Sequence, residues 1–154
     1  DAAKKFKVKN IVGITSDCPI IDHNLIIQVI DTFKFNKVEF VSNSDFRSFP
    51  DGMDVDVYKR KALEKSYVST KSKFYREHVT QYLKHNKKKF KQINIVAPKN
   101  LNWPSLGLTL DVYNDYVLLK KIIEHFKKKK NIFFGCHEVI ELLQKKKKYF
   151  FWLS

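Results

Sequence analysis

Two aspartates in this sequence follow apolar segments that are typical of β-strands. Asp17 comes shortly after Val8–Thr15, which reads VKNIVGIT, and Asp111 directly follows Leu106–Leu110. Because the carboxyl ends of parallel strands meet at one edge of a sheet, the two carboxylates can converge on one cleft. Two carboxylates with phosphate oxygens and waters suit Mg²⁺, which in nucleotidyl transfer neutralises triphosphate charge and stabilises the attacking and leaving oxygens. An alternative stays open on spacing alone, since an aspartate after a strand often only caps a helix or forms a turn.

The elements that would position these aspartates alternate between strand and helix. Apolar residues at helical spacing after Asp22, which can act as the N-cap, predict a helix through Phe33. Periodicity and turn residues predict strands at 38–41, 54–58 and 93–96, and helices at 59–67, 75–85, about 114–126 and 137–144. This alternation predicts an α/β fold whose mainly parallel sheet is covered by helices on both faces. Residues 1–154 are expected to form a single α/β domain without internal repeats.

The chain is strongly basic, with a formal net charge of +14 from 30 lysines and arginines against 16 acidic residues. Only three of the basic residues are arginines, and the lysines gather in short runs, such as 127–130, at the ends of predicted helices. Lysines there face the negative end of the helix dipole and keep a solvated surface. We therefore expect most of the positive charge to come from lysines on the solvated surface, and we expect no nucleic-acid partner. A basic anion-binding or nucleic-acid-binding domain stays open as an alternative.

Cysteine content and hydropathy bear on where the protein works. Cys18 and Cys136 lie far apart, and no Cys or His cluster has the spacing of a structural zinc site. A reducing, cytoplasmic compartment is the simplest interpretation. No apolar run approaches the roughly 20 residues needed to cross a bilayer, and no signal segment opens the sequence, so we expect neither a membrane partner nor export.

Four ordered blocks of the sequence resemble one enzyme family. The first is Ile14–Asp22, ITSDCPIID, and the second is Val41-Ser42-Asn43. The third is 47–57, RSFPDGMDVDV, and the fourth is 76–80, REHVT. A later block, LTLD at 108–111 followed by YNDY, agrees as well, so the resemblance covers nearly all of the chain. The blocks are similar to those of the cytidylyltransferases that activate acidic and related sugars, with the spore-coat-polysaccharide type as the nearest branch.

The resemblance implies a Rossmann-like α/β nucleotidyltransferase fold and a particular reaction. CMP would pass from CTP to a sugar hydroxyl with release of pyrophosphate, under Mg²⁺ held by Asp17 and Asp111. The sugar side would be lined by Arg47, Asp51, Gly52, Asp54, Arg76, Glu77 and His78. Arginine can bind a carboxylate or phosphate with two hydrogen bonds, and histidine can donate or accept one. Simpler alternatives remain: Asp51-Gly52 as a turn, Glu77 as helix first-turn charge, and His78 as a structural histidine.

The sequence departs from the family's pattern at two places. After Asp111 the related enzymes usually continue with an acidic residue and proline, whereas this chain has Val112 and Tyr113, which predicts a differently shaped loop. The family also opens with a strand and a Gly-rich loop whose backbone amides and cations hold the triphosphate. This chain has only four glycines, none paired closely enough for such a loop, and residues 1–6 resemble the end of a helix. We therefore expect the C-terminal part of the family's domain, with an incomplete nucleotide site and no activity alone.

The leading hypothesis from the sequence is a sugar-activating nucleotidyltransferase in surface polysaccharide or glycoconjugate precursor synthesis. Its substrates would be CTP and a sugar. The second hypothesis is a non-catalytic binding or assembly module that keeps the fold. In that case the apolar tail 149–152, YFFW, or the sugar-side loop would mediate contacts in a homo-oligomer.

Overall fold

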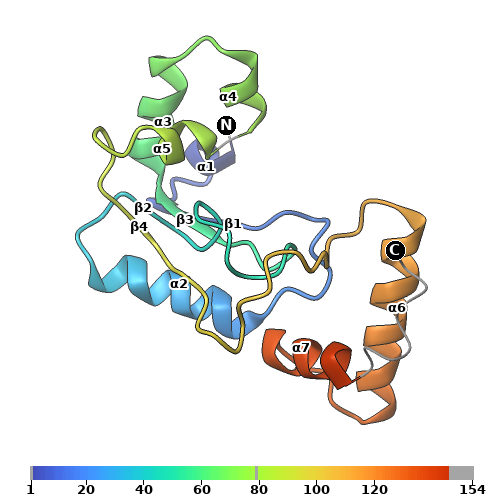
Figure 1. The fold of residues 1–154 in the computed structure, drawn as a ribbon. Helices are drawn as coiled ribbons and strands as arrows, with labels where there is room; N and C mark the ends of the chain where they lie inside the picture. Colours follow the sequence, from blue (N-terminus) through green and yellow to red (C-terminus); the bar gives the residue numbers. More distant parts are fainter. Residues whose placement is uncertain (1, 79, 146–154) are drawn as a thin grey trace. The chain divides into compact units, whose positions relative to one another are not determined.

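The computed structural model describes residues 2–78 and 80–145. The helices labelled in Figure 1 are α1 (Ala2–Lys5), α2 (His23–Phe35), α3 (Arg60–Ser69), α4 (Lys73–Glu77), α5 (Gln81–His85), α6 (Tyr113–Lys128) and α7 (Cys136–Lys145). The strands are β1 (Asn10–Gly13), β2 (Phe40–Ser42), β3 (Asp56–Lys59) and β4 (Gln92–Asn94). The aromatic tail 149–152, named in the assembly hypothesis, lies outside the described residues. No helix in the described part of the chain is both long and apolar enough to cross a membrane.

The described residues divide into two compact units. The sheet unit is made of residues within 1–14, 26–46 and 55–95, and it contains the strands β1 to β4, the helices α1, α3, α4 and α5, and most of α2. The loop unit is made of residues within 15–25, 47–54 and 96–154, and it contains α6, α7 and the first turn of α2. Both aspartates predicted to bind metal, Asp17 and Asp111, belong to the loop unit.

The sheet has the strand order β1-β3-β2-β4. Strand β3 pairs antiparallel with both β1 and β2, whereas β2 and β4 pair parallel. Strands β1, β2 and β4 therefore run in one direction and β3 runs against them. The predicted α/β class is confirmed, but the mainly parallel pairing is wrong, because β3 returns between β1 and β2 after a loop. A loop return produces an antiparallel neighbour, whereas a parallel neighbour needs a crossover connection.

Two predicted elements differ from the structure. The segment 106–110 is not a strand: its β-type pairing in the described part of the chain is a single parallel bridge between Gly107 and Asp51. Its backbone groups bond to two separate loops, so no regular ladder forms. The single helix predicted over 75–85 is also wrong. Helix α4 ends at Glu77, and His78 leaves the helical region with φ −94° and ψ 88° before α5 begins.

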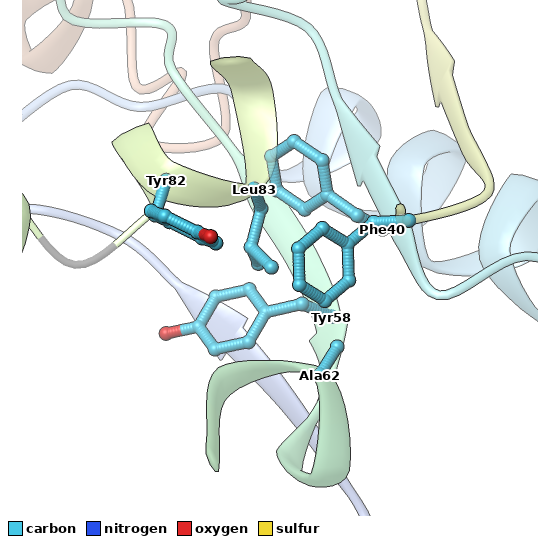
Figure 2. Close-up of a cluster of buried hydrophobic side chains, with 6 residues drawn as sticks. Phe40, Tyr58, Ala62, Tyr82 and Leu83 are labelled. Atoms are coloured by element: carbon cyan, nitrogen blue, oxygen red, sulfur yellow. The ribbon is translucent and has the colours of Figure 1, made fainter. Parts of the chain in front are cut away.

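A cluster of aromatic and aliphatic side chains forms a core in the sheet unit (Figure 2). Strands β2 and β3, helices α3 and α5, and the segment before β4 supply its members: Phe40, Tyr58, Ala62, Tyr82, Leu83 and Phe90. Phe40 and Phe90 are fully buried. Full burial of one such side chain contributes roughly 1.5–3 kcal/mol, so this cluster holds the short helix α5 against the sheet.

A buried aspartate of the loop unit caps the start of both α2 and α7. Asp22 Oδ1 accepts a hydrogen bond from the Asn24 amide at 2.8 Å, in the first turn of α2, which confirms the predicted N-cap. Its second oxygen, Oδ2, accepts one from the Cys136 amide at 2.8 Å, at the start of α7. Gly135 leaves room for this carboxylate, because a Cβ at that position would lie 2.5 Å from Oδ2. One side chain therefore satisfies free amides at two helix N-termini.

Candidate functional site

Backbone hydrogen bonds join three segments of the loop unit. The Asp51 amide donates to the Leu106 carbonyl at 2.9 Å, and the Leu108 amide donates to the Asp51 carbonyl at 2.9 Å. Farther along, the Leu110 amide donates to the Asp17 carbonyl at 2.8 Å. The segment 106–110 thus bonds first to the loop that carries Asp51 and then to the loop that carries Asp17. Asp111 follows Leu110 directly, so the structure places the two predicted metal-binding aspartates on neighbouring backbone segments.

The carboxylate of Asp17 is stabilised in its charged form. A hydrogen bond from the Thr15 side chain lowers the pKa of Asp17, and this outweighs the opposing effect of partial burial. The Cys18 thiol also donates to Asp17 Oδ1, at 3.6 Å. A half-buried carboxylate that stays ionised at neutral pH is suited to bind a cation. No role was predicted for Thr15 beyond its place in the family block.

The backbone at Asp111 is held by the start of α6. Asp115 Oδ2 accepts hydrogen bonds from the amides of Asp111 and Val112, both at 2.9 Å. Asp111 is exposed and lies just before the helix N-terminus, where the helix dipole favours a negative charge. This role of Asp115 was not predicted from the sequence. An acidic residue three positions after the residue that caps a helix is a known capping signal and could have revealed it.

The loop 47–54 carries its own ion pairs. Arg47 Nη1 lies 2.7 Å from Asp51 Oδ1, and Nη2 lies 3.4 Å from Asp54 Oδ2. The side chains of Arg47 and Asp51 are each 44% exposed, so these ion pairs contribute only about 0–1 kcal/mol each. An anionic or polyhydroxyl ligand can therefore compete for the guanidinium at small cost. Gly52 lies within this loop at φ +91° and packs against the Leu108 backbone.

The other predicted sugar-side residues lie in the sheet unit. Arg76 and Glu77 end α4, and His78 follows them. The Arg76 guanidinium lies 4.6 Å from the centre of the Tyr67 ring, and the His78 ring centre lies 4.7 Å from that of Phe74. All three side chains are exposed. The structure therefore gathers Asp17, Arg47, Asp51, Gly52, Asp54 and Asp111 in the loop unit and Arg76, Glu77 and His78 in the sheet unit.

The side chains of the described residues suit Mg²⁺ better than a metal whose ligands all come from the protein. Among residues 2–78 and 80–145, no group of three or more His, Cys, Asp or Glu side chains is placed to hold an ion. Mg²⁺ usually keeps several waters and needs only one or two protein carboxylates besides substrate phosphates. The two carboxylates predicted for this role, Asp17 and Asp111, equal that number. The neighbouring Cys18 does not offer a thiolate, because burial raises its pKa to about 11.

The two buried cysteines predict a loss of stability in alkaline solution. Burial raises the pKa of Cys18 to about 11 and that of Cys136 to about 12, from a reference value of 9.0. Since the folded protein favours the neutral thiols, their contribution to stability is present below about pH 9 and is lost as the pH rises through the folded pKa values. We expect the free energy of unfolding, measured with urea between pH 8 and pH 10, to fall more steeply in the wild type than in the Cys18→Ala/Cys136→Ala variant. Equal pH dependence of the free energy of unfolding in the two proteins would contradict the raised pKa values of the buried thiols.

Comparison with known proteins identifies the class of protein to which this α/β fold belongs. A family model described as cytidylyltransferase matches residues 1–149. The structure is similar to that of a cytidylyltransferase from Leptospira borgpetersenii serovar Hardjo-bovis, with a TM-score of 0.88 and 31% identity, over 96% of this chain and 61% of that chain. An uncharacterized protein of Methanocaldococcus jannaschii is 31% identical over 126 residues, which are 82% of this chain and 51% of that protein. The fold is therefore that of a nucleotidyltransferase.

The chain belongs to the cytidylyltransferase family. This confirms the family predicted from the blocks around Asp17, Asp51 and Asp111. The chain spans about half of the length of the Methanocaldococcus protein and 61% of the Leptospira chain.

Proposed function

We propose that this chain is the metal-binding and sugar-binding part of a cytoplasmic enzyme that transfers CMP from CTP to a sugar hydroxyl and releases pyrophosphate. The product would feed surface polysaccharide or glycoconjugate synthesis. One observation carries the proposal: in a member of the cytidylyltransferase family, the Leu110 amide bonds to the Asp17 carbonyl at 2.8 Å and so brings Asp111 beside the Asp17 loop.

Asp17 and Asp111 are the residues that would hold Mg²⁺. When bound, this ion neutralises triphosphate charge and stabilises the attacking and leaving oxygens. The hydrogen bond from Thr15 keeps Asp17 ionised for this role, and Asp115 fixes the backbone of Asp111. The first effect stabilises the charge of one carboxylate and the second holds the backbone that carries the other, so less reorganisation would be needed when substrate binds.

The loop 47–54 supplies both hydrogen-bond acceptors and a hydrogen-bond donor for a sugar. Its carboxylates, Asp51 and Asp54, accept hydrogen bonds from Arg47 and would accept them equally from sugar hydroxyls. The guanidinium can pair with the carboxylate of an acidic sugar through two parallel hydrogen bonds. Since the internal ion pairs of this loop are exposed and weak, an acidic sugar can replace them.

Pyrophosphate release from CTP tests the proposed function. The assay uses this chain, both alone and joined at its amino terminus to the Gly-rich segment of a cytidylyltransferase, with Mg²⁺ and a panel of acidic and amino sugars. We expect turnover with at least one sugar, and roughly 100-fold or greater losses in Asp17→Asn and Asp111→Asn. Asp31→Asn, a change at an exposed position on α2, serves as the control and should retain full activity. Absence of turnover with every sugar, or turnover that survives both substitutions, would contradict the proposal.

A further inference from the structure

The turn between α6 and α7 (Figure 1) carries two large apolar side chains that are exposed. Ile132 is 71% exposed and Phe133 is 76% exposed. The next residue is anchored instead, because the Phe134 ring stacks on the Phe126 ring with 4.2 Å between centroids. Phe133 contacts the His23 ring edge-on at 6.3 Å, and this contact leaves most of Phe133 exposed. Apolar side chains that gather on a surface are typical of a site that binds a partner.

The backbone of this turn has a defined conformation. Helix α6 ends in a Schellman motif, in which the Lys130 amide bonds to the Lys127 carbonyl at 3.0 Å. The Asn131 amide bonds to the Phe126 carbonyl, also at 3.0 Å. Lys130 has φ 55°, in the left-handed region, where this motif usually has glycine. A lysine in that conformation is strained. Backbone preference therefore does not account for a lysine at this position, whereas a use for its charge would.

Four exposed lysines, 127–130, precede the apolar pair. Among residues 2–78 and 80–145, none of the four forms an ion pair with a carboxylate. Their place at the end of α6 is favourable, since the C-terminal end of a helix dipole attracts cations. The dipole does not explain the exposed Ile132 and Phe133 beside them. A surface that combines unpaired cations with exposed apolar side chains is complementary to one that presents anions above an apolar layer.

We propose that residues 127–133, which we call the lysine turn, bind reversibly to the surface of an anionic lipid bilayer. The headgroups of such a bilayer attract lysine side chains, and the boundary of its acyl region accepts apolar ones. Lysine stems can lie along apolar groups while their ammonium groups reach the phosphates. The prediction of no membrane partner was based on the lack of a spanning segment, and surface binding does not need one. This inference goes beyond the proposed function and does not depend on it.

Single-stranded nucleic acid is a less suitable partner for the lysine turn. It binds through bases that stack on the faces of aromatic rings, in addition to cations near its backbone. Ile132 has no ring, and the Phe133 ring already contacts His23. An aliphatic and an aromatic side chain next to each other suit an apolar layer, whose contacts do not depend on ring geometry.

Sedimentation of the whole chain with vesicles tests the proposal. We expect wild-type protein to bind vesicles of phosphatidylcholine and phosphatidylserine far more tightly than vesicles of phosphatidylcholine alone. Ile132→Ser/Phe133→Ser should weaken binding about 10-fold although the net charge is unchanged. Lys127→Gln/Lys128→Gln/Lys129→Gln should weaken it about 100-fold. Urea unfolding should show both variants to be close to wild type in stability, because these side chains are exposed.

Matched controls change the same kinds of side chain elsewhere. Val68→Ser removes an aliphatic side chain that is 81% exposed on α3. Lys87→Gln/Lys88→Gln/Lys89→Gln removes an exposed lysine run that is followed by a fully buried aromatic side chain, Phe90. We expect both controls to bind vesicles within about 3-fold of wild type, since salt screens charges that lie far from the bilayer.

Lys130→Gly separates the charge of the lysine turn from its fold. We expect it to raise the urea concentration at the unfolding midpoint, because glycine suits the left-handed conformation. The lost cation should at the same time weaken vesicle binding about 5-fold. Lys130→Arg keeps the charge and should bind like wild type. Vesicle binding that is unchanged in Lys130→Gly would overturn the proposal.

The vesicle experiment has other outcomes that would contradict a membrane-binding turn. An equal loss of binding in the two lysine triple variants would show attraction to net charge alone. Binding that survives Ile132→Ser/Phe133→Ser, or wild-type protein that does not bind the anionic vesicles, would overturn the proposal as well. Tighter binding to single-stranded RNA than to anionic vesicles, weakened by the same substitutions, would assign the turn to nucleic acid instead.

Discussion

Replacement of Gly52 by alanine is expected to lower the free energy of unfolding by roughly 2–5 kcal/mol, from left-handed backbone strain and overpacking together. Gly52 has φ +91°, a conformation that side chains rarely adopt. A Cβ there would lie 2.7 Å from both the carbonyl carbon and oxygen of Leu108. That backbone cannot easily move, because the Leu108 amide is hydrogen-bonded to the Asp51 carbonyl at 2.9 Å. Displacement of segment 106–110 would also weaken the contact between Leu110 and Asp17.

Gly107→Ala is the matched control for this substitution. It lies in the same segment, and a Cβ there would meet no heavy atom within 4 Å. We expect its free energy of unfolding to stay within about 0.5 kcal/mol of wild type or to rise slightly, since alanine restricts the unfolded chain. Urea titration of both variants gives the comparison. Equal stability of the Gly52 and Gly107 variants would show that the loop 47–54 does not depend on close approach to Leu108.

Asp22→Ala is expected to destabilise the protein by roughly 2–4 kcal/mol, because it removes the cap of two helices and leaves two amides unpaired. Asp22 is 6% exposed, so water cannot easily replace its carboxylate. The amides that lose their partner are those of Asn24 in α2 and Cys136 in α7. Urea unfolding followed by circular dichroism measures the loss.

Two further variants separate the double cap from a general loss of charge. Asp22→Asn keeps one acceptor oxygen but turns a donor toward the second amide. Its free energy of unfolding should therefore lie between those of the wild type and Asp22→Ala. Asp31→Ala removes an exposed aspartate that pairs with Lys34 in the same helix, and we expect it to lower the free energy of unfolding by less than about 0.5 kcal/mol. If Asp22→Ala is no more destabilising than Asp31→Ala, the capping account is wrong.

Helices and strands could be read from the sequence where a local signal exists. The cap at Asp22 and the apolar spacing after it predicted α2, and the first half of the chain shows β1, β2 and β3 near the predicted ranges. Pairing direction has no such local signal. Strand β3 inserts between β1 and β2 with opposite direction, and only the partners' positions decide this. Segment 106–110 was misread for the same reason, since its apolar residues fit a strand while its hydrogen bonds go to loops.

The candidate site was predicted in part. The proximity of the Asp17 and Asp111 segments followed from both aspartates lying after apolar segments, although one of these segments is not a strand. The hydrogen bond from Thr15 to Asp17 could not be predicted, because it depends on the backbone conformation of the loop that carries both residues. Asp115 is the exception, since its capping distance from Val112 is visible in the sequence.

Paramagnetic broadening by Mn²⁺, as a substitute for Mg²⁺, tests most directly whether the two aspartates share one cation. In wild-type protein we expect the amide signals of residues 17–18 and 111–112 to broaden together at the same Mn²⁺ concentration. Asp17→Asn or Asp111→Asn should each abolish the broadening of both sets, whereas Asp31→Asn should leave it intact. Broadening of only one set, or broadening of both that persists after substitution of either aspartate, would contradict a shared metal site.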